Sequence, residues 1–477
     1  MEEGLTKKTV SGVYWSAIER FSVQGIQFVI QIIMARLLLP SDYGIIGMLA
    51  IFLQISQVFI DSGFNDALIQ KQNRTEKDLS TVFYFNILIS LVIYVIIYLF
   101  APCIASFYRM PELVEVTRFL FINLVLISFS AIHRTILTIK VDFKNQTKIS
   151  LVSVVVSGII GVYMAYRGLG VWALVVQSIM HSIFMTIFSY VYVKWRPHLC
   201  FSFNSFRQLF AFGSKLLLSR LINCIYRNLY TLVIGRKFTA TDLGYFTRAD
   251  QLATFPSYNI NSIISRVTYP ILSSIQDDDV RLKNAYRQYI RISSYIIFPL
   301  MLGLAALAEP VIRILLTDKW MGCVILLQIL CLDWMLDHIS QINMNLLLVK
   351  GHSDWALKLE LIKKTIAVLI LVSTIPFGIV AMCWGKVLYS IIATILNTRY
   401  TKTLISLSLF QQIKDVLPSL FLAGFVAFLV NICCSFILND FLKIMVGLLV
   451  GSFFYIFLSI ILKFNELKTL INILNIR

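Results

Sequence analysis

Long apolar stretches follow one another along the whole chain, and short polar segments separate them. Fourteen of these stretches reach the roughly 18 residues that a helix needs to cross the apolar core of a bilayer. The expected spans are 13–34, 43–66, 80–102, 115–137, 149–166, 171–193, 210–234, 251–274, 289–308, 321–348, 358–376, 378–398, 416–437 and 441–462. Apolar positions recur with the period of a helix, and alternating strands are scarce. The pattern predicts an all-α membrane protein with about 14 transmembrane helices.

The composition agrees with a membrane protein. Of the 477 residues, 58% are hydrophobic and 14% are charged, whereas a soluble protein carries about 25% charged residues. The first span contains Glu19, Arg20 and Gln24, so a cleaved signal peptide is not expected. The eight cysteines are scattered without a CxxC pair, which predicts neither a disulfide framework nor a metal site. No loop is long enough for a catalytic domain and no phosphate-binding loop occurs, so neither catalytic residues nor a cofactor is expected.

The net charge of +17 is distributed unevenly between the loops. If the amino terminus is cytoplasmic, 27 of the 42 Lys and Arg residues lie on inner segments, 10 on outer segments and five inside spans. Short cytoplasmic loops of membrane proteins carry such an excess. We therefore expect both termini in the cytoplasm. The basic charge reflects topology, and no nucleic-acid partner is expected.

Two halves of the chain correspond at an offset near 200 residues. Arg36, Asp42 and Gly44 align with Arg236, Asp242 and Gly244. This predicts one lobe over 1–200 (helices 1–6) and a second over 201–405 (helices 7–12), with helices 13 and 14 in 406–477. Because six is even, both copies enter the membrane in the same direction, as in the parallel type of transporter repeat with its pseudo-twofold axis along the membrane normal. Such lobes are expected to bind substrate between them, near mid-membrane.

Polar residues line one face of several predicted spans. They are Arg20, Gln24, Gln27 and Gln31 on the first; Gln54, Gln57, Asp61, Asn65 and Asp66 on the second; Arg220, Asn223, Arg227 and Thr231 on the seventh; and Asn261, Ser265 and Arg266 on the eighth. Their spacings of three and four place them on one side of each helix. A polar helix face is unstable in contact with lipid, which offers it no hydrogen-bond partners. We therefore expect these four helices to enclose a water-filled cavity.

Two interpretations of these polar residues stay open. Gln and Asn often hydrogen-bond between membrane helices, and Glu19 could neutralise Arg20. Arginines, by contrast, stay protonated and bind phosphate through a planar fork, so several in one cleft favour a dianionic ligand such as a pyrophosphate. The candidate head-group residues are Arg20, Arg220, Arg227, Arg266, Gln24, Gln27 and Asn223.

Acidic residues inside the spans are candidates for ion coupling. Asp333 and Asp337 form an i, i+4 pair, so one of them could carry a proton or bind sodium; a structural stripe explains them equally well. Further candidates are Glu19, Asp61 and Asp66. Lys386 is a lone cation in the twelfth span, which is typical of a residue satisfied within the bundle.

One sequence motif is similar to a known family. The pattern Gly244-Tyr245-x-x-x-Ala249-x-x-Leu252-x-x-x-Pro256 joins the early Arg36-x-Leu-x-Pro40-x-Asp42-Tyr-Gly44. Together they resemble polysaccharide exporters of the colanic-acid and teichuronic-acid type, which belong to the superfamily of multidrug, oligosaccharidyl-lipid and polysaccharide exporters. The similarity covers essentially the whole chain.

The resemblance implies a transporter and not an enzyme. It would flip undecaprenyl-pyrophosphate-linked oligosaccharide units across the bacterial inner membrane for O-antigen or exopolysaccharide synthesis. The implied partners are this lipid-linked substrate, membrane lipids and the polysaccharide polymerase machinery, and coupling to H⁺ or Na⁺ stays open. In related flippases, arginines of helices one, two, seven and eight line the cavity and the last two helices hold the lipid tail. In this chain the second helix carries Asp61 and Asp66 where some relatives have a cation.

Two rival functions remain. A cation-coupled drug exporter would share the fold but would need a more acidic cavity. A membrane glycan polymerase or ligase would normally carry a sizeable outward loop with catalytic residues, and the outward loops of this chain are short.

Overall fold

Helices joined by short turns make up the described chain. The computed structural model describes residues 22–61 and 63–475, and no strand occurs among them. The all-α prediction is therefore confirmed. Contacts divide the chain into two compact units, residues 1–244 and 245–477.

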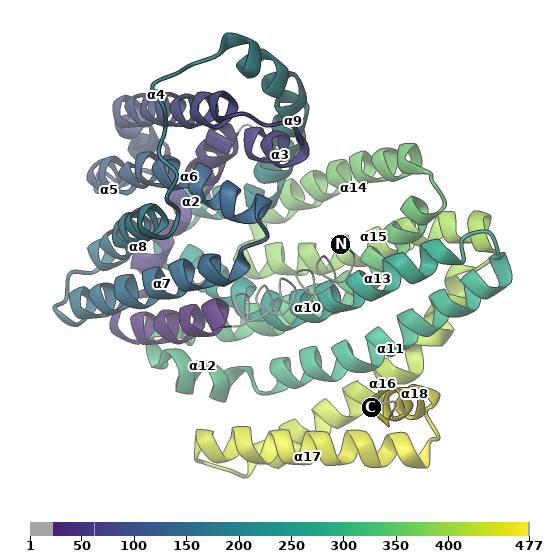
Figure 1. Ribbon diagram of the computed structural model, residues 1–477. Coiled ribbons are helices and arrows are strands. Elements are labelled where there is room, and N and C mark those ends of the chain that lie inside the picture. Colours follow the sequence, from purple (N-terminus) through teal and green to yellow (C-terminus); the bar gives the residue numbers. More distant parts are fainter. Residues whose placement is uncertain (1–21, 62, 476–477) are drawn as a thin grey trace. The chain divides into compact units, whose positions relative to one another are not determined.

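The first unit contains nine helices in its described part. Most of them are labelled in Figure 1. They are the helix Ser22–Leu37, α2 (Pro40–Asp61), α3 (Phe64–Gln70), α4 (Glu76–Tyr108), α5 (Leu113–Leu120), α6 (Ile122–Ile139), α7 (Phe143–Tyr166), α8 (Val171–Tyr192) and α9 (Phe203–Lys237). The helix α10 (Ala240–Ser274) begins in this unit and continues into the second.

The second unit continues with α-helices and two single 3₁₀ turns. They are α11 (Asp279–Ala306), α12 (Ala308–Leu316), η1 (Asp318–Trp320), α13 (Cys323–Val349), α14 (Ser353–Thr374), η2 (Ile375–Phe377), α15 (Ile379–Ile405), α16 (Leu409–Ser435), α17 (Asp440–Ile461) and α18 (Asn465–Asn475). Helix α17 packs along α16, as the yellow helices of Figure 1 show.

Every predicted span overlaps a helix, but the helices differ in how apolar they are. Ten helical stretches in the described residues are long and apolar enough to cross a membrane. Helices α9, α10 and α14 are not among them, because charged residues in α9 and α14 and mainly uncharged polar residues in α10 make them less apolar. The protein is therefore a multi-pass membrane protein, and the number of fourteen crossings stays a prediction.

The same order of helices occurs in both units. In the first unit α4 packs on α6, and α8 packs on both α6 and α7. In the second unit α11 packs on α13, and α15 packs on both α13 and α14. A short helix, α5 or α12, comes between the first two members in each case. This matching order supports the internal repeat that the sequence predicts.

Aromatic and aliphatic side chains form a core cluster in the first unit. Phe64, Leu68 and Ile132 are fully buried there, and they join α3 to α6. Thr75 caps the start of α4: its hydroxyl accepts from the backbone N–H of Asp78, and the Asp78 carboxylate accepts from the backbone N–H of Thr75. This reciprocal cap satisfies two backbone donors that the first turn leaves open.

Two glycines let the starts of α2 and α10 cross at very short range. A Cβ added to Gly44 would lie 1.7 Å from the carbonyl oxygen of Ala240, and one added to Gly244 would lie 1.9 Å from that of Pro40. The two contacts are reciprocal at an offset of 200 residues. Each helix also begins in the same way, because Asp42 accepts from the backbone N–H of Leu39 and Asp242 from that of Thr239. The crossing thus repeats the aligned sequence motif.

Replacing either glycine of the crossing should destabilise the protein. A methyl group in Gly44→Ala or Gly244→Ala would have to push a backbone carbonyl aside, and overpacking of this kind costs ~2 kcal/mol. We expect a lower unfolding temperature of the purified protein in detergent for both variants.

The matched control is Gly424→Ala in α16, where an added Cβ has no neighbouring heavy atom within 4 Å. The alanine there should leave stability unchanged or raise it by up to about 1 kcal/mol, because alanine favours helix. Equal effects at Gly44 and Gly424 would contradict the close crossing.

Candidate functional site

Four helices of the first unit, α2, α3, α6 and α9, carry a set of charged side chains in an otherwise apolar protein. Helix α3 begins after Gly63, which adopts a positive φ of 70° and approaches α9 closely. An added Cβ on Gly63 would lie 2.7 Å from the carbonyl oxygen of Gly213. This approach places the acidic first turn of α3 next to the polar side of α9. We name the set formed by Asp61, Asp66, Arg134, Arg220 and Arg227 the α2–α9 polar cluster.

An ion pair joins α3 to α9. The guanidinium of Arg220 donates to the carboxylate of Asp66, and both side chains stay accessible, at 45% and 41% of their full exposure. Charged groups at membrane depth face water or the inside of the bundle, because lipid cannot solvate them. The sequence did not predict this ion pair. The offset of 200 residues between the two halves aligns Asp66 with Arg266 and gives no relation between Asp66 and Arg220.

Asp61 at the end of α2 completes the acidic side. It accepts from the amide of Asn65 at 3.4 Å, and the hydroxyl of Thr135 on α6 donates to the Asn65 carbonyl oxygen at 3.2 Å. Asp61 also lies within the electrostatic reach of Arg220 and Arg134. The distribution of basic residues assigns Arg134 to a cytoplasmic segment, so it was not predicted as a site residue. A basic residue near the inner end of a span is expected on topological grounds alone, and its position therefore gave no signal of a site.

Helix α9 carries the rest of the predicted polar stripe. The amide of Asn228 is buried and donates to Gln54 on α2 at 2.9 Å, which ties the two helices together. Asn223 and Arg227 are exposed. Among the described residues, no ion pair involves Arg227. Asn228, which was not in the predicted stripe, thus hydrogen-bonds between helices, whereas the stripe residues Asn223 and Arg227 are exposed.

The other predicted head-group residues lie partly outside the described chain. Glu19 and Arg20 are among the residues that the structure does not describe, as is the side chain of Arg266. Gln24 is half-buried and Gln27 is exposed. In the described part, neither glutamine lies in hydrogen-bond contact with an arginine of α9. Their assignment to the site stays a prediction.

A second charged cluster lies inside the second unit. The ammonium of Lys386 on α15 sits between Asp250 of α10, at 2.9 Å, and Asp333 of α13, at 3.3 Å. The indole of Trp334 donates to Asp250 at 3.1 Å, and the hydroxyl of Ser390 donates to Asp333. Lys386 is therefore satisfied within the bundle, as its sequence context indicated. Asp250 was not predicted as its partner, although it lies within the 244–256 motif and is a charged residue beside a span.

The two predicted coupling acids, Asp333 and Asp337, have different partners in the structure. Asp333 is 9% exposed and already faces a cation that belongs to the protein. Asp337, one turn further, accepts from the amide of Asn261 at 3.0 Å. No group of three or more potential metal ligands occurs in the described chain. Ion coupling through Asp333 or Asp337 stays a prediction.

The α2–α9 polar cluster can bind an anion. Arg220 pairs with Asp66, and Arg220 and Arg134 lie within electrostatic reach of Asp61. Helix α9 adds the exposed guanidinium of Arg227 two turns from Arg220, so the set holds three arginines and two carboxylates. The excess positive charge is carried by arginine, whose planar fork matches phosphate oxygens and whose proton is not lost at accessible pH.

The fold matches solved transporters. The lipid II flippase MurJ in an inward closed conformation aligns with 94% of this chain and 99% of its own, with a TM-score of 0.76 at 16% identity. An inward-facing multidrug resistance MATE family transporter of the MOP superfamily covers 83% of this chain and 99% of its own, with a TM-score of 0.62 at 14% identity. At these identities the likeness shows the fold alone, which is a helical multi-pass membrane fold.

The sequence matches a protein family. The family described as polysaccharide biosynthesis protein matches residues 33–325, so the chain belongs to it. The teichuronic acid biosynthesis protein TuaB of Bacillus subtilis is 26% identical over 463 residues, covering 96% of both chains. The lipopolysaccharide biosynthesis protein WzxC of Escherichia coli is 26% identical over 422 residues, covering 87% of this chain and 83% of its own. The resemblance to polysaccharide exporters is confirmed.

Removing the ammonium of the second cluster should destabilise the protein strongly. In Lys386→Met the carboxylates of Asp250 and Asp333 would face each other without a cation, and breaking a buried ion pair in this way costs about 3–5 kcal/mol. Thermal unfolding of the purified protein in detergent measures the loss. Adding Asp250→Asn to the same chain should restore part of it.

Lys402→Met is the control for this prediction, because Lys402 is exposed near the end of the same helix. It should unfold like the original protein. Comparable loss of stability in the two methionine variants would show that the Lys386 cluster is not a stabilising contact.

Proposed function

We propose that this protein is an alternating-access flippase that exports undecaprenyl-pyrophosphate-linked oligosaccharide units across the bacterial inner membrane for surface polysaccharide synthesis. The observation that carries the proposal is the excess of arginine over carboxylate in the α2–α9 polar cluster. Family membership supports it, as do two relatives named for teichuronic acid biosynthesis and lipopolysaccharide biosynthesis and a third named a succinoglycan biosynthesis transport protein. The solved lipid II flippase shares the fold.

The pyrophosphate is the part of such a substrate that the cluster would bind. Arg220 is oriented by Asp66, so its fork is already positioned for a second acceptor. Asn223 and Arg227 extend the same side of α9 by one and two turns. Sugars would be hydrogen-bonded by amides of the stripe, including Gln24 and Gln27. The isoprenoid tail would stay in lipid beside α16 and α17, the predicted thirteenth and fourteenth spans.

The membrane potential offers a driving force that needs no ATP. We place both termini in the cytoplasm, on the basis of the basic residues in the inner loops. An inside-negative potential then favours outward movement of an anion by about 2.3 kcal/mol per charge per 100 mV. Coupling to H⁺ or Na⁺ through Glu19, Asp61, Asp66, Asp333 or Asp337 is a second source.

The drug-exporter alternative shares the fold with the solved MATE transporter. A site for organic cations needs an excess of carboxylates, whereas the α2–α9 polar cluster has an excess of arginines. In the second unit, the acids Asp250 and Asp333 already face the ammonium of Lys386. The charges therefore favour an anionic substrate.

Arg220 is the first residue to test. Delivery of labelled undecaprenyl-pyrophosphate-linked sugar to the outer leaflet of vesicles should fall at least tenfold in Arg220→Ala, because a lost charge-assisted hydrogen bond is worth about 1.5–3 kcal/mol. Arg220→Lys should retain part of the rate, since a point charge replaces a planar fork. Asp66→Asn should lower delivery less than Arg220→Ala does, because the arginine remains and only the carboxylate that orients it is lost.

Arg281→Ala is the matched control, because Arg281 is exposed in the first turn of α11 and lies outside the cluster. It should deliver substrate normally. If Arg220→Ala also delivers normally, Arg220 is not a ligand. If the original protein delivers no lipid-linked sugar but exports ethidium from vesicles, the flippase proposal fails.

A further inference from the structure

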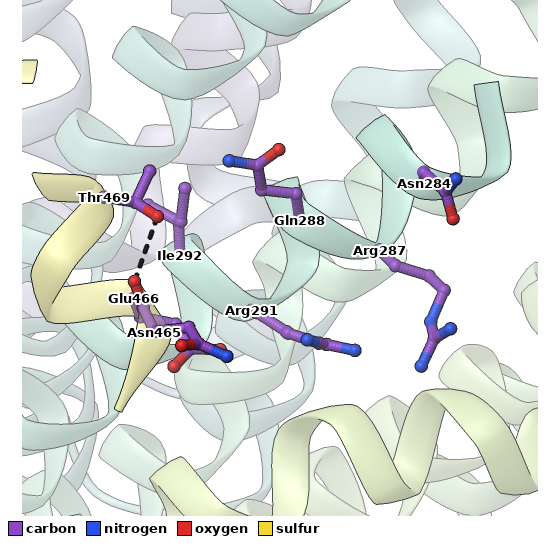
Figure 2. Close-up of a pocket in the computed structure, with 8 residues that line it drawn as sticks. All are labelled: Asn284, Arg287, Gln288, Arg291, Ile292, Asn465, Glu466 and Thr469. Carbon is purple, nitrogen blue, oxygen red and sulfur yellow. Dashed lines mark hydrogen bonds between the residues drawn. The ribbon is translucent and has the colours of Figure 1, made fainter. Parts of the chain in front are cut away.

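A small pocket lies between α11 and the C-terminal helix α18, both in the second unit. Figure 2 shows it, with Arg287, Gln288 and Arg291 projecting from α11 and Asn465, Glu466 and Thr469 from α18. The cavity encloses about 260 Å³. Pockets that bury a whole small-molecule ligand measure about 300–1,000 Å³. The pocket therefore suits a compact charged group and not an oligosaccharide.

One wall of the pocket is formed by Arg287 and Arg291, and both side chains bind the carboxylate of Asp415. The carboxylate of Asp415 on α16 is only 5% exposed, and it accepts from Nε and Nη2 of Arg287 at 2.6 and 2.7 Å. It accepts from Nε and Nη2 of Arg291 at 3.0 and 2.6 Å. Two guanidinium groups thus share one carboxylate, and their side chains remain 31% and 33% exposed. This wall carries one excess positive charge with a fixed orientation.

The opposite wall is the first turn of α18, and it carries a negative charge. Glu466 is half-buried there and lines the pocket together with Arg291 (Figure 2). The hydroxyl of Thr469 donates to the carbonyl oxygen of Asn465 at 3.0 Å, which closes the turn. The two walls of the pocket therefore have opposite charges.

The pocket lies beside the end of an apolar helix that is long enough to cross a membrane. The apolar helix α17 ends at Ile461, and α18 begins four residues later at Asn465. Helix α18 is amphipathic, with Leu467, Leu470 and Ile471 on one side and Lys468 and Asn472 on another. Helices of this type lie in the interface between water and lipid tails. Lipid head groups occupy the same level.

We propose that this pocket binds the head group of a zwitterionic aminophospholipid, such as phosphatidylethanolamine. The phosphate contacts Arg287 and Arg291, and the ammonium contacts Glu466. The charges of the pocket favour this ligand. The excess positive charge of the arginine wall matches the phosphate, the negative charge of Glu466 matches the ammonium, and the filled pocket is neutral. A pyrophosphate would leave Glu466 facing an anion, which is unfavourable. A phosphatidylglycerol head group would leave Glu466 without a partner.

Lipid binding to the purified full-length protein tests the pocket without any transport assay, so the outcome is independent of the proposed function. Native mass spectrometry or thermal unfolding in detergent compares dioleoyl phosphatidylethanolamine, phosphatidylcholine and phosphatidylglycerol. The original protein should bind phosphatidylethanolamine most tightly, because only this lipid has a positive charge that also carries N–H donors. The choline of phosphatidylcholine has no N–H group, and the glycerol of phosphatidylglycerol has no positive charge. Glu466→Gln should lower the ratio of phosphatidylethanolamine to phosphatidylglycerol affinity by about tenfold.

Asp277→Asn is the matched control, because this exposed acid lies in the turn before α11 and does not line the pocket. It should keep the original lipid preference. A ratio compares two lipids on one protein, so a general loss of stability cannot imitate the effect. The proposal is wrong if phosphatidylglycerol binds as tightly as phosphatidylethanolamine, or if Glu466→Gln leaves the ratio unchanged. Displacement of phosphatidylethanolamine by farnesyl pyrophosphate at lower concentration would assign the pocket to the pyrophosphate lipid and also overturn it.

Discussion

The inability of lipid to solvate charge is the constraint on which this structure depends. A cation or carboxylate on a membrane helix must meet an opposite charge, a hydrogen-bond partner or water. The described charges follow this rule across long separations in sequence. Arg220 meets Asp66, Lys386 lies between Asp250 and Asp333, and two arginines of α11 meet Asp415. Each contact joins different helices of one unit, so the pairs also determine which helices pack together.

The three charge clusters differ in their net charge and in how accessible their side chains are. The Lys386 cluster contains two carboxylates for one ammonium in a largely buried place, which suits a structural role. The α2–α9 polar cluster has more arginines than carboxylates, and its Arg220–Asp66 pair stays accessible. The α11–α18 pocket has opposite charges on its two walls. An excess of charge favours an ionic ligand, and balanced charges on separate walls favour a zwitterion.

Duplication explains much of the architecture. The order of helices and short helices from α4 to α8 recurs from α11 to α15. At the start of each repeat's second helix, a glycine admits the backbone of the other copy, and an aspartate caps the turn before it. A side chain at either glycine would overlap a carbonyl oxygen. The paired Asp-x-Gly motif in the sequence is therefore a packing requirement as well as a family signature.

The sequence by itself determined the helical class, the approximate position of each long helix in the described chain and the internal repeat. These follow from hydropathy and periodicity, which are local properties of the chain. It also identified most members of the α2–α9 polar cluster, because a polar residue inside an apolar span stands out without any knowledge of contacts. Only the tertiary structure decided the partners. Arg220 meets Asp66, Arg134 joins the cluster from α6, and Asp250 meets Lys386, across separations of 154 and 136 residues for the two ion pairs. The α11–α18 pocket could not be predicted from the sequence either. Its charged residues lie on two segments that are far apart in the chain, one basic and one polar, and neither indicates a site by itself. Pairing between distant helices depends on how they pack, and a one-dimensional pattern of polar positions does not contain that information.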